Sequence, residues 1–274
     1  MTERHPFDVD TAVRRVADLE FEAEIANDRW WVVRGPNGGF VAAIVLRALM
    51  EALNDPSRPP RSLTVHYPAA PQPGTMAIRV TIEKVGRTSA TLSARVTQGD
   101  RVVALALAAF SGPFPADDFS TARMPEVPPA DAVQVPPGLP GAPKFTENFE
   151  YRFEVGPPPF SGAEEARSGG WLRLREPRVL DFPLAATYAD AWIPAIFTRM
   201  STFAAVPTID LTVYFREPLP LDGAQPEDFV LAVFQTRVAR NGLFEEDGEV
   251  WSPDGRLLVQ SRQLAAILPR PPSA

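Results

Sequence analysis

Alternation of apolar and polar residues is the clearest pattern in the chain, and it predicts two similar sets of β-strands. Residues 63–67 (LTVHY) and 211–215 (LTVYF) alternate in this way. Longer alternating stretches follow at 78–96 and 231–251, and each set closes after a turn containing Gly and Asp, at 99–110 and 254–267. Turns of this kind join the two strands of a hairpin. The order of these segments is the same in both halves and indicates an internal repeat.

One mostly apolar helical stretch precedes the alternating strands in each half. These stretches are Gly38–Leu53 (GGFVAAIVLRALMEAL) and Pro183–Phe197 (PLAATYADAWIPAIF). Pro183 suits a first helical turn, and Pro194 is expected to kink or end its helix. Further matching strands are expected ahead of the helices: 21–25 with 149–153, and 29–33 (RWWVV) with 170–174 (GWLRL). One apolar helix per antiparallel sheet predicts an α+β protein of two units, each a sheet wrapped around a helix.

A proline-rich stretch separates the two halves. Residues 113–143 contain nine prolines. Because proline fixes φ and removes a backbone donor, this stretch is expected to be extended and irregular. The predicted organisation is an N-terminal unit at 1–112, a linker at 113–144 and a C-terminal unit at 145–274.

Composition removes several classes of function. The chain of 274 residues has no cysteine and two histidines, which excludes thiolate chemistry, disulfides and a histidine-rich metal site. The formal charge is −7 with no basic stripe, so nucleic acid is not an expected partner. There is no run of about 18 apolar residues, and the polar start is unlike a secretory signal. These features are compatible with a cytoplasmic protein with no membrane span.

Three polar residues in the second set of strands are candidates for chemistry. Asp210 interrupts a strand, where Asp is unfavourable, and the repeat has Ser62 in its place. Gln263 shares a face with apolar residues, and its counterpart is Ala108. Thr236 also lies on an apolar face. A solvent-facing strand residue is the alternative for Asp210, a structural hydrogen bond is the alternative for Gln263, and an ordinary strand threonine is the alternative for Thr236.

The stretch GPNGG, residues 35–39, is a candidate binding element. Glycine lets a backbone approach a ligand closely, and the free N–H groups of a first helical turn form an electropositive site. Asn37, Gly38 and Gly39 are therefore candidate binding residues. A tight turn between strand and helix is the alternative. The second half has no such glycines, so the two halves are expected to combine into one site per chain.

The chain resembles the tandem (double) hotdog acyl-CoA thioesterases of the thioesterase II group. The matching segments are GPNGGFVAAIVLRAL, SLTVHYPAAP, VGRTSATLSARV, PTIDLTVYFREPL and DGRLLVQSRQLA. The resemblance implies two hotdog units and a site of Asp, Thr or Ser, and Gln, carried here to Asp210, Thr236 and Gln263. It also implies water attack on an acyl-CoA thioester, with backbone N–H groups near Gly38 and Gly39 receiving the oxyanion.

The same resemblance bears on cofactors and assembly. It implies no metal and no cofactor, acyl-CoA as the substrate, and a homo-oligomer. Two other functions remain open on this fold: a non-catalytic protein that binds acyl groups or acyl-CoA, and an enoyl-CoA hydratase. The hydratase reaction would need an Asp and His pair in a short loop motif, which neither His5 nor His66 provides.

Overall fold

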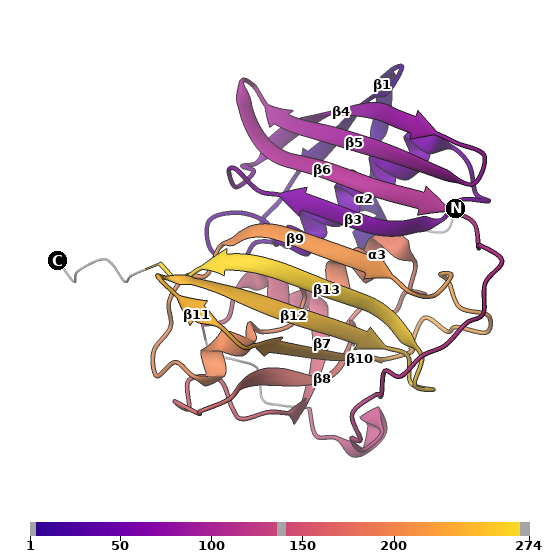
Figure 1. The fold of residues 1–274 in the computed structure, drawn as a ribbon. Coiled ribbons are helices and arrows are strands. Elements are labelled where there is room, and N and C mark those ends of the chain that lie inside the picture. The colour runs from indigo at the N-terminus through magenta and orange to yellow at the C-terminus, as the bar shows by residue number, and fades with distance from the viewer. Residues whose placement is uncertain (1–3, 136–140, 269–274) are drawn as a thin grey trace.

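The described residues, 4–135 and 141–268 of a computed structural model, form one antiparallel sheet of 13 strands. The strands are β1 (Arg14–Ala17), β2 (Glu20–Ile25), β3 (Pro60–His66), β4 (Gly74–Val85), β5 (Ser89–Gln98), β6 (Arg101–Ser111), β7 (Phe149–Val155), β8 (Ala166–Leu174), β9 (Thr208–Phe215), β10 (Val230–Thr236), β11 (Ala239–Arg240), β12 (Leu243–Trp251) and β13 (Leu257–Ala266). Their order is β1-β2-β4-β5-β6-β3-β9-β13-β12-β10-β8-β7, with β11 beside β12 (Figure 1). The first half of the chain therefore builds one side of the sheet and the second half builds the other.

The two halves meet where β3 pairs with β9. Leu63 lies opposite Val213, and Val65 lies opposite Leu211. This register is centred on Thr64 and Thr212, whose hydroxyl oxygens lie 3.0 Å apart. The two threonines are equivalent residues of the repeat LTV. The halves are therefore related by an approximate two-fold axis through this pair, and the predicted tandem hotdog fold is confirmed.

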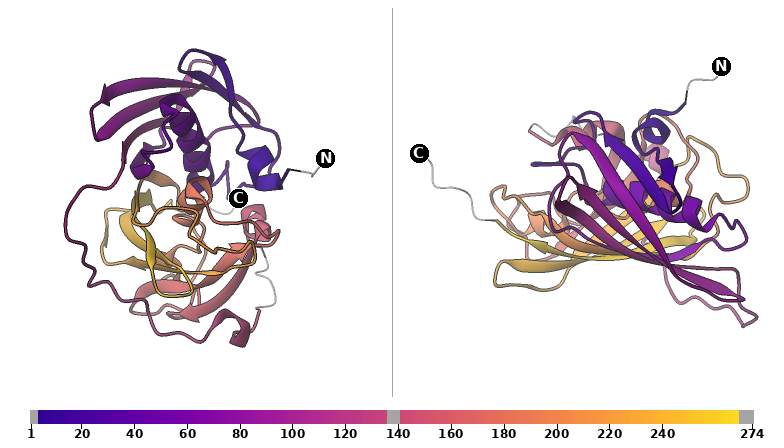
Figure 2. Two further views of the ribbon diagram at one scale, coloured as in Figure 1. Left: turned by 90° about the vertical axis from the view of Figure 1, so that its right-hand side faces the viewer. Right: turned by 90° about the horizontal axis from the view of Figure 1, so that it is seen from above.

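The helices lie on one face of the sheet, behind it in Figure 1 and above it in the right-hand view of Figure 2. They are α1 (Pro6–Asp10), α2 (Gly38–Leu53) and α3 (Phe182–Tyr188), with 3-10 turns η2 (Lys144–Asn148) and η3 (Ala195–Thr198). A further 3-10 turn, η1 (Ala130–Ala132), lies on the other face of the sheet. Asn37 caps α2, because its side-chain oxygen accepts the N–H of Phe40 at 3.0 Å. The residues of α2 from Gly39 to Leu46 are all buried. The main core is formed between this helix, α3 and the concave face of the sheet.

The second helix is shorter than the sequence pattern predicts. We expected a helix over Pro183–Phe197, but α3 ends at Tyr188 and is followed by η3. The N–H of Asp190 bonds to the carbonyl of Thr187, three residues back, which tightens the chain and ends the helix. Pro194 then prevents a helix from continuing to Phe197. The early end releases Asp190 from the helix, and this placement is central to the site.

The prediction of a strand at residues 29–33 is also wrong. Trp31 forms only an isolated bridge with Pro36, and the N–H of Val32 bonds to the carbonyl of Gly35. This turn brings the chain back on itself before α2, so its residues cannot extend the sheet. The pairing of β2 with β4 and of β8 with β10 makes β2 the counterpart of β8. The expected match of residues 21–25 with residues 149–153 is therefore off by one strand: β2, which contains residues 21–25, corresponds to β8 and not to β7.

The proline-rich connection packs on the outer, convex face of the second half of the sheet. Val133 is buried there against five residues of the sheet and of the segment before β10: Trp171, Phe229, Leu231, Val233 and Trp251. Met124 and Val127 of the connection pack beside it. The indole N–H of Trp171 donates to the carbonyl of Pro128 at 2.8 Å. This connection therefore covers an apolar surface of the sheet and serves as more than a spacer. Helices long and apolar enough to cross a membrane are absent from the part of the chain that the structure describes.

This packing predicts that the connection contributes to stability. Val133→Ala should lower the free energy of unfolding by roughly 1–3 kcal/mol, because it removes buried methyl groups beneath the connection. Val135→Ala is the matched control, since Val135 is 58% exposed and should change stability by less than about 0.5 kcal/mol. Denaturant unfolding measures both. Equal effects would show that the connection does not stabilise the sheet.

Candidate functional site

The start of α2 is packed unusually closely against α3. A Cβ atom on Gly39 would lie 2.8 Å from the carbonyl oxygen of Thr187 and 2.9 Å from that of Ala186. A Cβ atom on Gly38 would lie 3.0 Å from the carboxylate of Asp190. Real Cβ atoms do not approach backbone oxygens below 3.0 Å without a shift, so the glycine at position 39 is required by packing. This approach joins the two halves on the concave side of the sheet.

Asp190 follows α3 and is held by the first turn of α2. Its Oδ2 atom accepts the backbone N–H of Gly39 at 3.0 Å and the side-chain amide of Asn37, also at 3.0 Å. The same amide donates to the backbone carbonyl of Asp190 at 2.8 Å. The contacts span more than 150 residues of sequence and cross between the halves. A carboxylate at the N-terminus of a long helix is stabilised by the free N–H groups and the helix dipole.

The protonation of Asp190 reflects two opposing effects. Burial raises the pKa of Asp190 to about 6, and the N–H groups of Gly39 and Gly38 and the amides of Gln263 and Asn37 oppose that rise. Desolvation disfavours the charged form, whereas donors to the carboxylate favour it. The group is therefore mainly ionised at neutral pH and remains basic enough to accept a proton. Such a pKa suits a general base.

A second group of polar side chains lies on the same face of the sheet. The hydroxyl of Thr208 donates to Oε1 of Gln263 at 2.8 Å, and Nε2 of Gln263 donates to Oε1 of Glu246 at 2.9 Å. Gln263 lies opposite Glu246 on β12 and opposite Leu211, a core residue, on β9. The Gln263 amide lies close enough to Asp190 to lower its pKa, with no direct hydrogen bond between these two described residues. The arrangement brings an Asp, a Thr and a Gln together on the concave side.

Tyr67 lies at the edge of this group. Its hydroxyl donates to the carbonyl of Gly38 at 2.8 Å, and its backbone N–H bonds to the carbonyl of Ile209. Burial raises the pKa of Tyr67 well above its usual value, and the nearby carboxylates of Asp190 and Asp210 add to that rise. Tyr67 therefore remains a neutral hydrogen-bond donor that ties the start of α2 to the end of β3.

Four of the residues selected from sequence meet at this place: Asn37, Gly38, Gly39 and Gln263. The first three do so in a way we did not foresee, because Asn37 and Gly39 direct their donors to Asp190. Their predicted part in binding the thioester stays a prediction.

Asp210 makes no side-chain hydrogen bond with this group among the described residues, although its charge acts on Tyr67 at the edge of the group. Asp210 lies opposite His66 on β3 and Leu264 on β13, one residue along from Leu211. Successive strand residues point to opposite faces, so Asp210 and Gln263 lie on opposite faces of the sheet. Its assignment as the site carboxylate stays a prediction that mutation can decide.

Thr236 lies at the end of β10, buried, with a hydroxyl that has no hydrogen-bond partner among the described residues. The pairing of β10 with β12 ends at Gln235 opposite Asp247, and continuing this register leads from Thr236 toward Glu246, with no hydrogen bond between these two described residues. The register alone thus relates Thr236 to the group, whereas Thr208 contacts Gln263 directly.

Four residues of the group were not selected from the sequence: Asp190, Thr208, Glu246 and Tyr67. A signal existed for the first: Asp190 is the one acidic residue in the apolar stretch Phe182–Phe197. Thr208 lies two residues before Asp210, and a register shift between Leu264 and Ala265 changes the alternation of β9 at that point. Simple alternation therefore assigns Thr208 and Asp210 to one face, while the structure gives only Thr208 a bond to Gln263.

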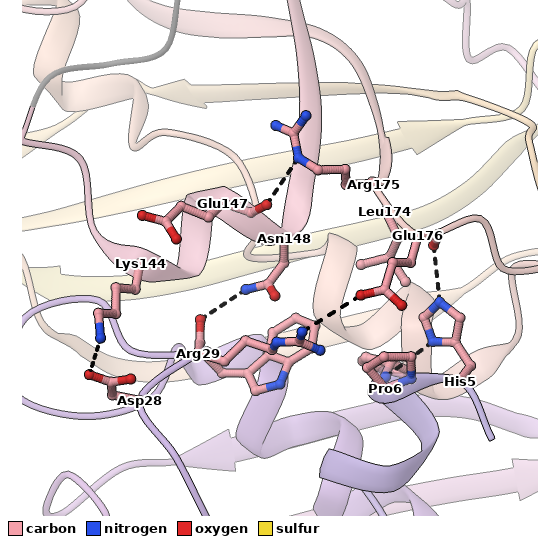
Figure 3. A pocket seen from close by; sticks show the side chains of 12 residues that line it. His5, Pro6, Asp28, Arg29, Lys144, Glu147, Asn148, Leu174, Arg175 and Glu176 are labelled. Carbon is pink, nitrogen blue, oxygen red and sulfur yellow. Dashed lines mark hydrogen bonds and ion pairs between the residues drawn. The ribbon is translucent and has the colours of Figure 1, made fainter. Parts of the chain in front are cut away.

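A separate cavity of about 400 Å³ lies between the N-terminal segment, the start of η2 and the end of β8 (Figure 3). Trp30 forms part of its wall and stacks on Phe40 of α2. Two ion pairs lie around it: Lys144 with Asp28 at 2.5 Å, and Arg29 with Glu176 at 3.6 Å. These two ion pairs connect the segment before α2 with the second part of the chain, and neither Asp190 nor Gln263 lines the cavity.

The fold and site define a tandem hotdog protein with one mixed polar group at the boundary of its halves. Comparison with known families gives the same class. Residues 27–111 match the acyl-CoA thioesterase N-terminal domain, and residues 122–267 match the acyl-CoA thioesterase C-terminal domain. The chain belongs to the acyl-CoA thioesterase family.

Individual proteins share this architecture. An uncharacterized protein of Mycobacterium tuberculosis is 29% identical, over 90% of each chain. A hot dog protein of unknown function from Alicyclobacillus acidocaldarius has a TM-score of 0.88 and 26% identity, over 98% of this chain and 100% of that chain. An acyl-CoA thioesterase II from Mycobacterium marinum has a TM-score of 0.76 and 17% identity, over 97% of this chain and 99% of that chain. At that last identity the likeness is one of fold.

The close packing of α2 on α3 predicts a penalty for a side chain at Gly39. Gly39→Ala should lower the free energy of unfolding by about 1–3 kcal/mol, because α3 must move away from the new methyl group. Gly86→Ala is the control, since a Cβ atom there meets its nearest atom at 3.4 Å. Thermal unfolding of both variants tests this. A wild-type melting temperature for Gly39→Ala would show that α2 and α3 can separate freely.

The hydrogen bonds to Asp190 predict a shift in its titration. Asn37→Ser retains a capping oxygen for α2 but removes the amide donor to Asp190, so the pKa of Asp190 should rise by roughly half a unit to one unit. NMR titration of a labelled Asp190 carboxyl measures it. Asn27→Ser is the control, because Asn27 is exposed and makes none of the hydrogen bonds to Asp190, and it should leave the titration unchanged. A lower pKa in Asn37→Ser would contradict the assigned role of the amide.

Proposed function

We propose that the protein hydrolyses acyl-CoA thioesters to the free acid and CoA. The observation that carries the proposal is the convergence of the Asp190 carboxylate with the bonded pair Thr208 and Gln263 at the N-terminus of α2. Membership of the acyl-CoA thioesterase family supports acyl-CoA as the substrate. Acyl-CoA is the proposed small-molecule partner, and a homo-oligomer is the expected assembly.

In this proposal Asp190 acts as the general base. A water molecule bound beside its carboxylate attacks the thioester carbon, and Asp190 accepts the proton that the water loses. With a pKa of about 6, Asp190 is ionised at neutral pH and is still basic enough for this transfer. Burial and the N–H donors of α2 set that balance together.

Thr208 and Gln263 orient the water in the proposed mechanism. The hydrogen bond from Thr208 uses the amide oxygen of Gln263, which leaves its nitrogen to donate. One N–H goes to Glu246, and the other is available on the side of Asp190. An amide fixed at both ends contributes by positioning, because it costs no reorganisation during the reaction.

The N-terminus of α2 favours negative charge in two places. It stabilises the Asp190 carboxylate through Gly39, and its field also favours the oxyanion that forms when water adds to the thioester. This retains for Gly38 and Gly39 the supporting role that the sequence suggested. The oxyanion then collapses to the carboxylic acid as the C–S bond breaks, and the released thiolate of CoA takes up a proton from Asp190 or solvent.

The function is tested with a panel of acyl-CoA substrates of graded chain length, with the released thiol detected by a chromogenic reagent. Hydrolysis of any member above the uncatalysed rate supports the proposal. Binding of acyl-CoA by calorimetry without release of thiol would instead identify an acyl-CoA-binding protein. Hydration of an enoyl-CoA, without thiol release, would identify a hydratase.

Two carboxylates compete for the catalytic role, and mutation separates them. Asp190→Asn should lower kcat by at least about 100-fold, because the amide cannot accept the proton. Asp210→Asn, on the other face of the sheet, should leave kcat within about threefold of wild type. Steady-state kinetics at neutral pH measures both. If Asp210→Asn is the inactive variant instead, the assignment first made from sequence is the correct one.

A further inference from the structure

Glu246 is a buried carboxyl group for which the proposed reaction has so far no use. Its residue is 3% exposed, and it is the only Asp, Glu, Lys or Arg among the fully buried residues that the structure describes. Neither oxygen contacts a Lys, Arg or His: Oε1 accepts from Gln263 at 2.9 Å, and Oε2 accepts from the backbone N–H of Ala195 at 2.5 Å. A buried acid without a cation is costly to keep charged.

The position of Glu246 connects it to Gln263 on one side and to the start of η3 on the other. It lies directly opposite Gln263 in the pairing of β12 with β13. Its second oxygen holds the N–H of Ala195 at the start of η3, five residues after Asp190. Glu246 thereby holds two parts of the structure: the side-chain amide of Gln263 and the start of η3, which follows Asp190 in the chain.

We propose that Glu246 is a positioning residue that holds the Gln263 amide with its oxygen toward Thr208 and its nitrogen toward Glu246. The inference rests on the proposed hydrolase function. It assigns Glu246 no contact with substrate. An amide can rotate by half a turn at little cost in shape, and Glu246 is the group that makes one orientation favourable: it accepts from the nitrogen, while Thr208 donates to the oxygen.

The protonation of Glu246 supports this role. Burial raises the pKa of Glu246 to about 8; the N–H of Ala195 and the amide of Gln263 oppose that rise, and the charges of Asp190 and Glu245 add to it. These two carboxylates are the charged groups that act on it.

The neutral acid also fits the charge balance of the reaction. At neutral pH Asp190 carries the one negative charge that the site needs, and Glu246 keeps its proton. When Glu246 ionises at higher pH, a second buried negative charge opposes formation of the oxyanion. The structure thus predicts an upper pH limit that originates in Glu246.

The pH dependence of kcat/KM tests the proposal. Wild type should show a bell-shaped profile, with an acid limb near pH 6 from Asp190 and an alkaline limb near pH 8 from Glu246. Glu246→Gln keeps an oxygen that can accept from Gln263 but cannot ionise, so the alkaline limb should disappear while the acid limb remains. Glu249→Gln is the matched control: Glu249 lies on the same strand, on the opposite face, opposite Val233. Its profile should match wild type.

A double-mutant cycle tests whether Glu246 acts through Gln263. Glu246→Leu removes the acceptor and should lower kcat by about 10- to 100-fold, with KM changed by less than about threefold. In a Gln263→Ala background the same change should lower kcat by less than about twofold, because the amide it positions is already gone. If the loss of kcat in the double variant equals the product of the losses in the two single variants, Glu246 and Gln263 act independently and the proposal is overturned.

A readout independent of activity covers the case in which a variant folds poorly. Glu246 has its pKa raised from 4.5 unfolded to about 8 folded, so its stabilising effect is complete below pH 4.5 and is lost as pH rises to 8. Asp190 acts in the same sense only up to about pH 6. Between pH 6 and 8 the free energy of unfolding should therefore fall in wild type and fall less in Glu246→Gln.

The outcomes separate this inference from the function on which it rests. If wild type hydrolyses no acyl-CoA, both are overturned. If wild type is active and Glu246→Gln retains the alkaline limb, or wild type and Glu246→Gln lose stability equally between pH 6 and 8, only the inference about Glu246 is overturned. A lost alkaline limb together with a non-additive cycle supports it.

Discussion

The approach of α2 to α3 at Gly39 is the constraint on which the site depends. Backbone carbonyls of α3 occupy the space that any side chain at position 39 would need. Only this spacing lets the carboxylate of Asp190 accept the N–H of Gly39 and the amide of Asn37. The electropositive helix end comes from one half of the chain and the acid from the other. The same contact between α2 and α3 therefore both packs the two halves together and stabilises the charge of Asp190.

The same arrangement places two acids where water is scarce. Asp190 is stabilised by N–H donors and stays ionised, whereas Glu246 has two donors, no cation and the charge of Asp190 nearby. Environments that push two carboxyl groups apart in pKa give them different roles. Both groups weaken the folded state as pH rises, so the polar side chains on this face are maintained at a cost in stability. The apolar residues along α2 and the inner strands offset that cost.

Much of the fold could be predicted from the sequence, because its signals are local. The apolar run Gly38–Leu53 is the observed α2, and the alternating stretches after it are the observed strands. The place of Asp190 beside the start of α2 could not be found in this way. Asp210 was conspicuous because acids are rare in strands, whereas Asp190 lies just beyond a helix whose length depends on a tight last turn. Its partners come from 150 residues earlier in the chain, and no pattern within a window of sequence reports such contacts.

The two-fold relation through Thr64 and Thr212 has a consequence for how such a molecule assembles and diverges. The pairing of β3 with β9 has the geometry of an isologous interface between identical subunits. Since one chain supplies both sides, dilution cannot separate them, and the halves meet at a high effective concentration. Each side is also encoded separately. A substitution in one half is not copied into the other, so one half can lose its polar residues, as at Ala108, while the other keeps Gln263.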